Sequence, residues 1–314
     1  MLALRIALGL ALAYVVLVIL AWRFQERLAF PAPRAPLPDP QRVGVANGER
    51  VQLVSSDGTN LVGWYLKPEV GGGRGRLGEA VPHRSNLPQP PPTSPTSPGL
   101  LWFYGNGETI AAIWPIVREF QPPGTAVLVV DYPGYGGSAG RANEAGLYAA
   151  ADAAYAALVA RPGIDPDRIY VYGRSLGSAA ATWVAARHPV AGLILESPFT
   201  SAGAMARQLY ALLPRFIVRL SLDNLGRMRQ IRCPVLVFHG DADRLVPTAM
   251  GREVAAAAAG PVELVLIHGA GHNETYDRGG RQYRDKLWEF IDRTGRGRRD
   301  GAAPPVPRPS SPRP

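Results

Sequence analysis

One serine of this sequence stands where a nucleophile for carbonyl chemistry is needed. Gly173-Arg174-Ser175-Leu176-Gly177 joins an apolar, strand-like run to an Ala-rich, helix-like run. A tight strand-to-helix turn holds a serine hydroxyl clear of the sheet, and the two glycines leave room where strand and helix nearly touch. The helix N-terminus also brings a positive dipole end and the Leu176 N–H to the reacting oxygen. We therefore predict Ser175 as the nucleophile and Leu176 as one donor of an oxyanion hole.

A serine hydroxyl needs a neighbouring base, and two histidines lie in a suitable loop. His268 and His272 flank a Gly-Ala-Gly turn that follows the last apolar run, VELVLI. A catalytic histidine is expected in an accessible loop beyond the carboxyl end of a strand, where parallel sheets form their ligand crevice. His272 lies further out on this loop. We predict that His272 is the base, with His268 as the alternative.

A carboxylate must orient that imidazole and fix its tautomer. The run HGDADRLVP offers Asp241 and Asp243 after one strand, and Glu196 ends the neighbouring strand-like run. Asp243 lies further into its loop, where it can turn back toward the sheet edge. We predict Asp243 as the acid, and Asp241 and Glu196 stay as alternatives.

An oxyanion hole needs a second N–H, and Tyr-Gly-Asn-Gly-Glu follows the strand-like run GLLWF. Its two glycines permit an unusual backbone path, so the N–H of Asn106 is the predicted partner of the Leu176 N–H. A helix-capping role for Asn106 is the alternative. The run DYPGYGGSAG comes to the same edge, and Tyr132 and Tyr135 either line the pocket or pack beneath it.

The elements that position these residues alternate along the chain. Continuous apolar runs indicate strands buried on both faces, which is typical of a mostly parallel sheet covered by helices. The first two runs, separated by Asp57-Gly58, predict an antiparallel hairpin at one edge. The sequence therefore predicts an α/β fold with an eight-stranded sheet, formed by RVQLVSS, LVGWYL, GLLWFYG, AVLVVDY, RIYVYG, AGLILES, PVLVFHG and VELVLIHG.

The chain divides into an anchor, a body and a tail. Residues 1–30 carry an apolar run long enough to cross a bilayer, with Arg and aromatic residues at its ends. A cleaved signal peptide is the alternative, but no small-residue cleavage site follows the run. Residues 31–293 form the predicted domain, residues 71–98 a Pro/Gly-rich disordered insert, and residues 294–314 a disordered basic tail. The charges that flank the anchor and its short N-terminal flank favour opposite orientations, so both stay open.

Composition excludes some other functions. The net charge is +9, but the excess lies in the tail and beside the apolar segment, so we expect no nucleic-acid partner. Cys233 is the single cysteine, which rules out an internal disulfide. We predict no metal site and no cofactor.

Seven motifs in fixed order resemble those of the membrane-anchored α/β-hydrolase-domain proteins of types 13 and 17 and their bacterial relatives. The resemblance covers about residues 22–292 and implies the α/β-hydrolase fold, with Ser175, Asp243 and His272 as its triad. Two residues depart from the family pattern: Tyr104 replaces a usual His, and Ser178 replaces a common Gly. The motifs are FQERLAF, FYGNGE, DYPGYGGS, GRSLGSA, LESPFTS, HGDADRLVP and GAGHN.

These features predict a membrane-anchored serine hydrolase that cleaves an ester or thioester. The apolar, Arg-punctuated segment 201–220 predicts a small helical lid and, beside an anchor, an acylated or lipid-like substrate. A catalytically silent scaffold that binds a ligand or protein at the membrane is one alternative. A peptidase or acyltransferase that uses the same triad is another.

Overall fold

The computed structural model describes residues 1–69 and 96–299, with side chains to residue 295. Its centre is an eight-stranded sheet with the order β1-β2-β4-β3-β5-β6-β7-β8. β2 runs antiparallel to both β1 and β4, and the other neighbouring strands are parallel. The predicted α/β-hydrolase sheet, with its antiparallel edge hairpin, is confirmed. The strands are β1 (Gly48–Val54), β2 (Asn60–Leu66), β3 (Ser97–Phe103), β4 (Ala126–Val130), β5 (Ile164–Arg174), β6 (Gly192–Glu196), β7 (Val235–Gly240) and β8 (Val262–Ile267).

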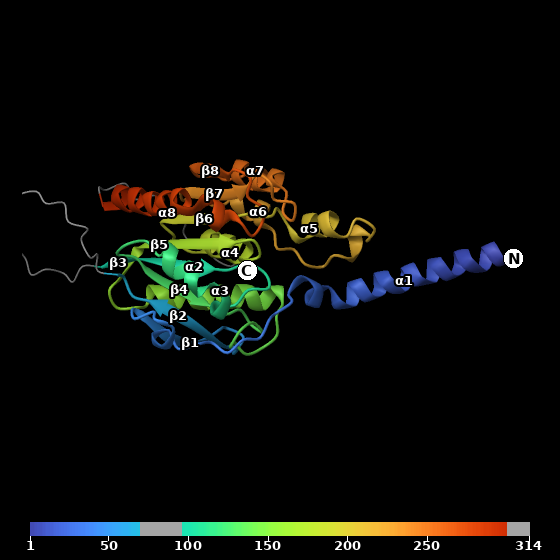
Figure 1. Cartoon of the computed structure of the whole chain (residues 1–314), viewed down its shortest axis with the longest axis horizontal. Coiled ribbons are helices and arrows are strands. Elements are labelled where there is room, and N and C mark those ends of the chain that lie inside the picture. The colour runs from blue at the N-terminus through green and yellow to red at the C-terminus, as the bar shows by residue number, and fades with distance from the viewer. Residues whose placement is uncertain (70–95, 300–314) are drawn as a thin grey trace, which may run out of the picture.

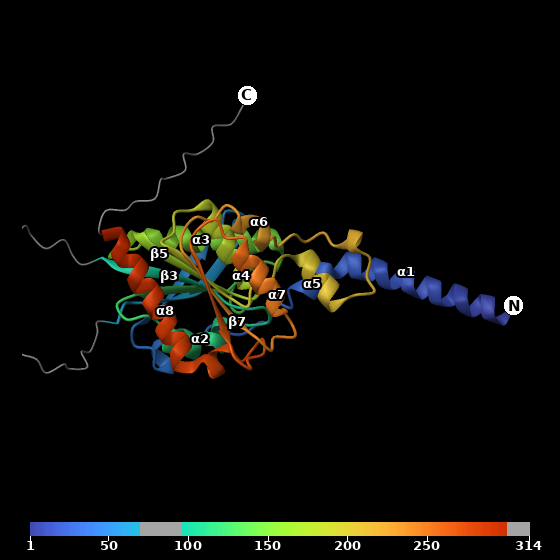
Figure 2. The ribbon, with the colours of Figure 1, turned by 90° about the horizontal axis from the view of Figure 1, so that it is seen from above.

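Helices cover both faces of this sheet (Figure 2). One face carries α3, α4, α6 and α7, and the other carries α2 and the long α8. Phe120 of α2 packs against Tyr276 and Tyr283 of α8. The central strands are buried along their whole length because both of their faces are covered. The helices are α2 (Ile110–Phe120), α3 (Glu144–Val159), α4 (Gly177–Arg187), α5 (Ala202–Leu209), α6 (Asn224–Met228), α7 (Thr248–Ala256) and α8 (Thr275–Arg299), with 3-10 turns η1 (Gln41–Val43) and η2 (Arg215–Ile217).

The N-terminal helix α1 (Leu2–Ala29) extends away from the body (Figure 1). Its most apolar window has a mean hydropathy of 2.5 and is 0% buried within the structure. Among the described residues it is the one helix long and apolar enough to cross a membrane. The predicted lid is present as α5 and η2, which lie on the same side of the body as α1.

Two predicted boundaries differ from the structure. β3 begins at Ser97, so the end of the predicted insert belongs to a strand. α8 continues to Arg299, so Thr294, predicted to begin the tail, lies within a helix, and its hydroxyl contacts the Phe290 carbonyl and the Tyr170 hydroxyl. The rest of the insert and of the tail lies outside the described residues, and its disorder stays a prediction.

Candidate active site

Ser175 occupies the turn between β5 and α4. Its φ is +48°, in the left-handed region that side chains disfavour, so the turn is strained. The flanking glycines are required, because a Cβ on Gly173 would lie 2.4 Å from the Gly177 carbonyl oxygen. Ser178, where a glycine is common among the relatives that the sequence resembles, donates from its hydroxyl to the Ser175 carbonyl at 2.6 Å. The strained turn is thus held from its own helix.

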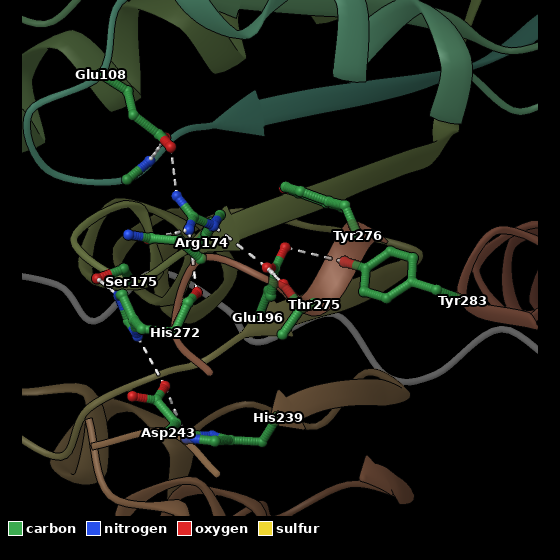
Figure 3. A network of polar contacts seen from close by, with 12 residues as sticks. Glu108, Arg174, Ser175, Glu196, His239, Asp243, His272, Thr275, Tyr276 and Tyr283 are labelled. Carbon is green, nitrogen blue, oxygen red and sulfur yellow. Dashed lines mark hydrogen bonds and ion pairs between the residues drawn. The ribbon is translucent and has the colours of Figure 1, made fainter. Parts of the chain in front are cut away.

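The structure brings the three residues of the predicted triad together (Figure 3). His272 Nε2 lies 3.0 Å from Ser175 Oγ, and His272 Nδ1 lies 2.7 Å from Asp243 Oδ2. An ionised carboxylate only accepts hydrogen bonds, so His272 Nδ1 carries the proton and Nε2 is free to accept from the serine. This arrangement can remove a proton from Ser175 as the hydroxyl attacks a carbonyl carbon.

Asp243 is held from several sides at the end of β7. The N–H groups of Leu245 and Val246 both donate to its Oδ1 at 2.9 Å. Burial raises the pKa of Asp243, but hydrogen bonds from His239 and His272 outweigh burial and hold that pKa below its ordinary value. The acid therefore stays ionised at neutral pH.

His239, at the end of β7, also faces the acid. It is fully buried, and its Nε2 lies 2.9 Å from the Val246 carbonyl and 3.5 Å from Asp243 Oδ2. A carbonyl can only accept, so His239 Nε2 carries a proton that also faces the acid. The position of His239 four residues before Asp243 was the available signal in the sequence.

This geometry gives a pH prediction for stability. The folded pKa of Asp243 is depressed, so its ionised form stabilises the fold above the unfolded pKa of about 3.9, and this contribution is lost as pH falls below that value. Asp243→Asn should therefore lower the free energy of unfolding at pH 7. Urea unfolding of both chains should show that the difference in their free energies of unfolding shrinks as the pH falls from about 4 toward the acid limit of folding. A difference independent of pH would contradict the assignment of the shift to Asp243.

The two alternative residues from the sequence pair with each other instead. His268 Nδ1 lies 2.9 Å from Asp241 Oδ2, and the His268 side chain is 99% exposed. This pair stands at the surface of the same two loops, with neither member bonded to Ser175. Its geometry is that of a solvent-exposed hydrogen-bonded pair.

The third alternative, Glu196, lies in a buried network centred on Arg174 (Figure 3). Arg174 ends β5 beside Glu196 of β6 and donates to it at 3.2 Å. Its guanidinium also donates to the His272 carbonyl at 3.1 Å, to Asn273 Oδ1 at 2.8 Å and to Glu108. One buried cation thus joins the histidine loop to the loop after β3.

The same network reaches the predicted oxyanion loop. Glu108 accepts from the Gly105 N–H at 2.6 Å, so Arg174 and Glu108 together fix the start of this loop. Burial lowers the pKa of Arg174, but Glu196 and Glu108 raise it more, so the guanidinium stays charged. Sequence reasoning missed this role, although the opposite charges that end two adjacent buried strands were a usable signal.

The N–H groups of the two predicted oxyanion donors, Leu176 and Asn106, are both without an acceptor among the described residues. Leu176 precedes the first residue of α4, and its N–H has no hydrogen-bond acceptor among the described residues. The Asn106 N–H is likewise without an acceptor in the described part of the chain. The Asn106 side chain does not cap α2, whose N-cap is Thr109. It accepts from the Tyr135 hydroxyl at 2.7 Å and donates at 2.8 Å to the carbonyl of Ala29, the last residue of α1.

Tyrosines pack beneath the oxyanion loop. Tyr132 and Tyr135 are buried, and the Tyr132 hydroxyl donates to the Tyr104 carbonyl at 2.7 Å. The packing interpretation of these two residues therefore holds. Tyr104, the departure from the family pattern, donates to buried Asp131 at 3.0 Å. No group of three or more His, Cys, Asp or Glu in the described ranges is placed to hold a metal ion.

Comparison with known proteins identifies the family. A family model described as the alpha/beta hydrolase fold matches residues 98–224. An uncharacterized protein of Mycobacterium tuberculosis is 34% identical over 276 residues, which cover 87% of this chain and 89% of that protein. The chain belongs to the α/β-hydrolase family. The alpha/beta hydrolase domain-containing protein 17B of Homo sapiens is 34% identical over 165 residues, or 52% of this chain and 56% of that protein.

Solved structures of this family share the architecture. An esterase of Pyrococcus furiosus has 17% sequence identity and a TM-score of 0.63, covering 83% of this chain and 98% of the esterase. An acetyl xylan esterase from Paenibacillus has 18% identity and a TM-score of 0.58, covering 80% of this chain and 85% of that enzyme. At these identities the likeness establishes the fold, and the resemblance to the type 17 proteins rests on the sequence matches.

Proposed function

We propose that this α/β hydrolase is a membrane-anchored serine hydrolase that cleaves a carboxylic ester or thioester through an acyl-enzyme on Ser175. The observation that carries the proposal is the unbroken series of contacts from Ser175 Oγ to His272, at 3.0 Å, and from His272 to Asp243, at 2.7 Å. The exposed apolar helix α1 supports the anchor. No second activity is favoured by a separate contact in the site.

The reaction follows from this geometry. Ser175 Oγ attacks the carbonyl carbon while its proton passes to His272 Nε2, and Asp243 stabilises the imidazolium. The N–H groups of Asn106 and Leu176 donate to the oxyanion. The bond to the leaving group then breaks, and His272 returns the proton to that group. A water molecule attacks the acyl-enzyme in the same way, which releases the acid and restores the serine hydroxyl.

A fluorophosphonate probe tests this proposal directly. The wild-type chain in detergent should be labelled with the probe's phosphonyl mass on Ser175, and Ser175→Ala should not be labelled. Ser56→Ala is the control, because Ser56 is exposed in the turn between β1 and β2 and should leave Ser175 reactive. Labelling that persists in Ser175→Ala would refute the nucleophile. No labelling of wild type would favour the catalytically silent scaffold, and amine products from peptides would favour a peptidase.

A further inference from the structure

The lid segment 209–219 lies along the half of α1 that is nearer the body, between Tyr14 and Gln25. The Tyr14 hydroxyl donates to the Leu212 carbonyl at 2.8 Å, well along α1. Nearer the body, Gln25 donates to the Ile217 carbonyl at 3.2 Å and accepts from the Arg219 N–H at 2.7 Å. Both views of the ribbon agree that the segment after α5 reaches out beside α1 (Figures 1 and 2).

The tip of this segment presents large apolar side chains to its surroundings. Leu212 is 82% exposed and Phe216 is 86% exposed, and Leu209 and Tyr210 are exposed beside them. A cluster of this kind at the end of a protruding loop marks an interaction surface rather than ordinary surface variation. Exposed apolar side chains also cover α1, so the tip and the helix that it contacts both present apolar side chains to their surroundings.

The register of the contact fixes the depth of the tip. The uncharged run of α1 is bounded by Arg5 and Arg23 and spans about 26 Å, close to the ~30 Å of a bilayer core. Tyr14 lies midway along this run, about 12 Å beyond Trp22 along the helix axis. If α1 crosses a bilayer, a segment that hydrogen-bonds Tyr14 lies below the headgroups.

Several backbone polar groups of the segment have hydrogen-bond partners, which lowers the cost of placing the segment in lipid. Tyr14 bonds the Leu212 carbonyl, and the N–H groups of Tyr210, Leu213 and Val218 donate to carbonyls within the segment or α5. The Arg219 guanidinium lies 4.8 Å from the centre of the Trp22 ring, where interfacial aromatic residues lie. Four arginines flank the apolar tip and the body-proximal end of the apolar run of α1: Arg23, Arg27, Arg207 and Arg219. The acid among them is Glu26, and a fifth arginine, Arg215, lies within the tip.

We propose that the lid tip, residues 209–217, is a second membrane contact that inserts beside α1 into a leaflet containing anionic lipids. Apolar side chains meet acyl chains, and the flanking arginines meet lipid phosphates. Gln208, at the base of the tip, donates to the Arg244 carbonyl at 3.4 Å, and Arg244 follows Asp243 in the chain. Insertion of the tip therefore presents the active site to the bilayer. The substrate of that site is then an acyl group that already lies in the membrane. This inference rests on the proposed anchor and hydrolase.

Spin labels in bilayer nanodiscs of phosphatidylglycerol and phosphatidylcholine test the depth. In a Cys233→Ala background, a label on Leu212→Cys should be relaxed by oxygen and shielded from an aqueous nickel chelate. Ala160→Cys, exposed at the far end of α3, should behave in the opposite way. Leu17→Cys reports on the anchor itself. A shielded Leu17 with a chelate-accessible Leu212 would overturn the lid inference alone, whereas an accessible Leu17 would overturn the anchor and with it this inference.

Activity gives a second readout. Leu212→Asp combined with Phe216→Asp should lower hydrolysis of a long-chain ester embedded in the bilayer about tenfold or more, because two apolar anchors become charged. Hydrolysis of a short, water-soluble ester should stay within about twofold of wild type. Val262→Asp, another exposed apolar position at the amino end of β8, should leave both activities unchanged. Equal loss on both esters would mean a damaged active site and would contradict the membrane role of the tip.

Discussion

Replacing Asp243 with asparagine is expected to lower kcat by about 10⁴-fold, the size of the effect for the matching change in a serine protease. The amide can present an N–H to His272 Nδ1, which would then carry no proton, and Nε2 could not accept from Ser175. The 2.7 Å contact that now fixes the tautomer would be reversed. Steady-state hydrolysis of a nitrophenyl ester by the purified full-length chain measures the change.

Asp241→Asn is the matched control for this variant. Asp241 lies two residues away in the same loop and pairs with exposed His268 at the surface. We expect its kcat to stay within a few fold of wild type. If Asp241→Asn lost activity and Asp243→Asn kept it, the acid would be wrongly assigned. Equal losses in both variants would indicate that the loop itself, rather than one carboxylate, had been disturbed.

Arg174→Met is expected to lower the free energy of unfolding by about 3–5 kcal/mol, because it leaves the buried Glu196 carboxylate without its cation. Glu196 is fully buried, and Arg174 donates to it and to Glu108. Urea unfolding followed by tryptophan fluorescence measures the loss. The catalytic rate should also fall in the folded variant, because the His272 carbonyl and the oxyanion loop lose a shared donor.

Two further variants isolate the cause. Arg278→Met removes an exposed pair with Glu274 and should leave the free energy of unfolding almost unchanged, because water screens an exposed pair. Adding Glu196→Gln to Arg174→Met should recover part of the loss, because the unpaired buried charge is gone. A loss in Arg174→Met no larger than that of the surface pair would contradict the buried network.

The architecture was predictable because its signals are local. Each buried strand is a continuous apolar run, and Gly173 is required by a contact with Gly177, four residues along the chain. The order Ser175, Asp243, His272 then follows from where three strands end. The structure confirms the predicted sheet, and the sequence comparisons confirm the family. The catalytic roles of Ser175, Asp243 and His272 remain predictions.

The contacts that were missed depend on how distant segments come together. Arg174 and Glu196 become partners only once β5 and β6 are known to be neighbours in that register. The contact of Tyr14 with Leu212 needs the angle at which α1 leaves the body, which no local pattern encodes. Tyr132 and Tyr135 left two interpretations open because a tyrosine beside a site can either line it or support it.

The link between Asn106 and the Ala29 carbonyl has a mechanical consequence. A single-span helix adapts to the thickness of its host bilayer by tilting. If α1 crosses a bilayer as proposed, its tilt acts on the lid through Tyr14 and Gln25 and on the loop that would hold the oxyanion through Asn106. Membrane thickness would then be coupled to catalytic geometry through the Asn106 amide as well as through the lid.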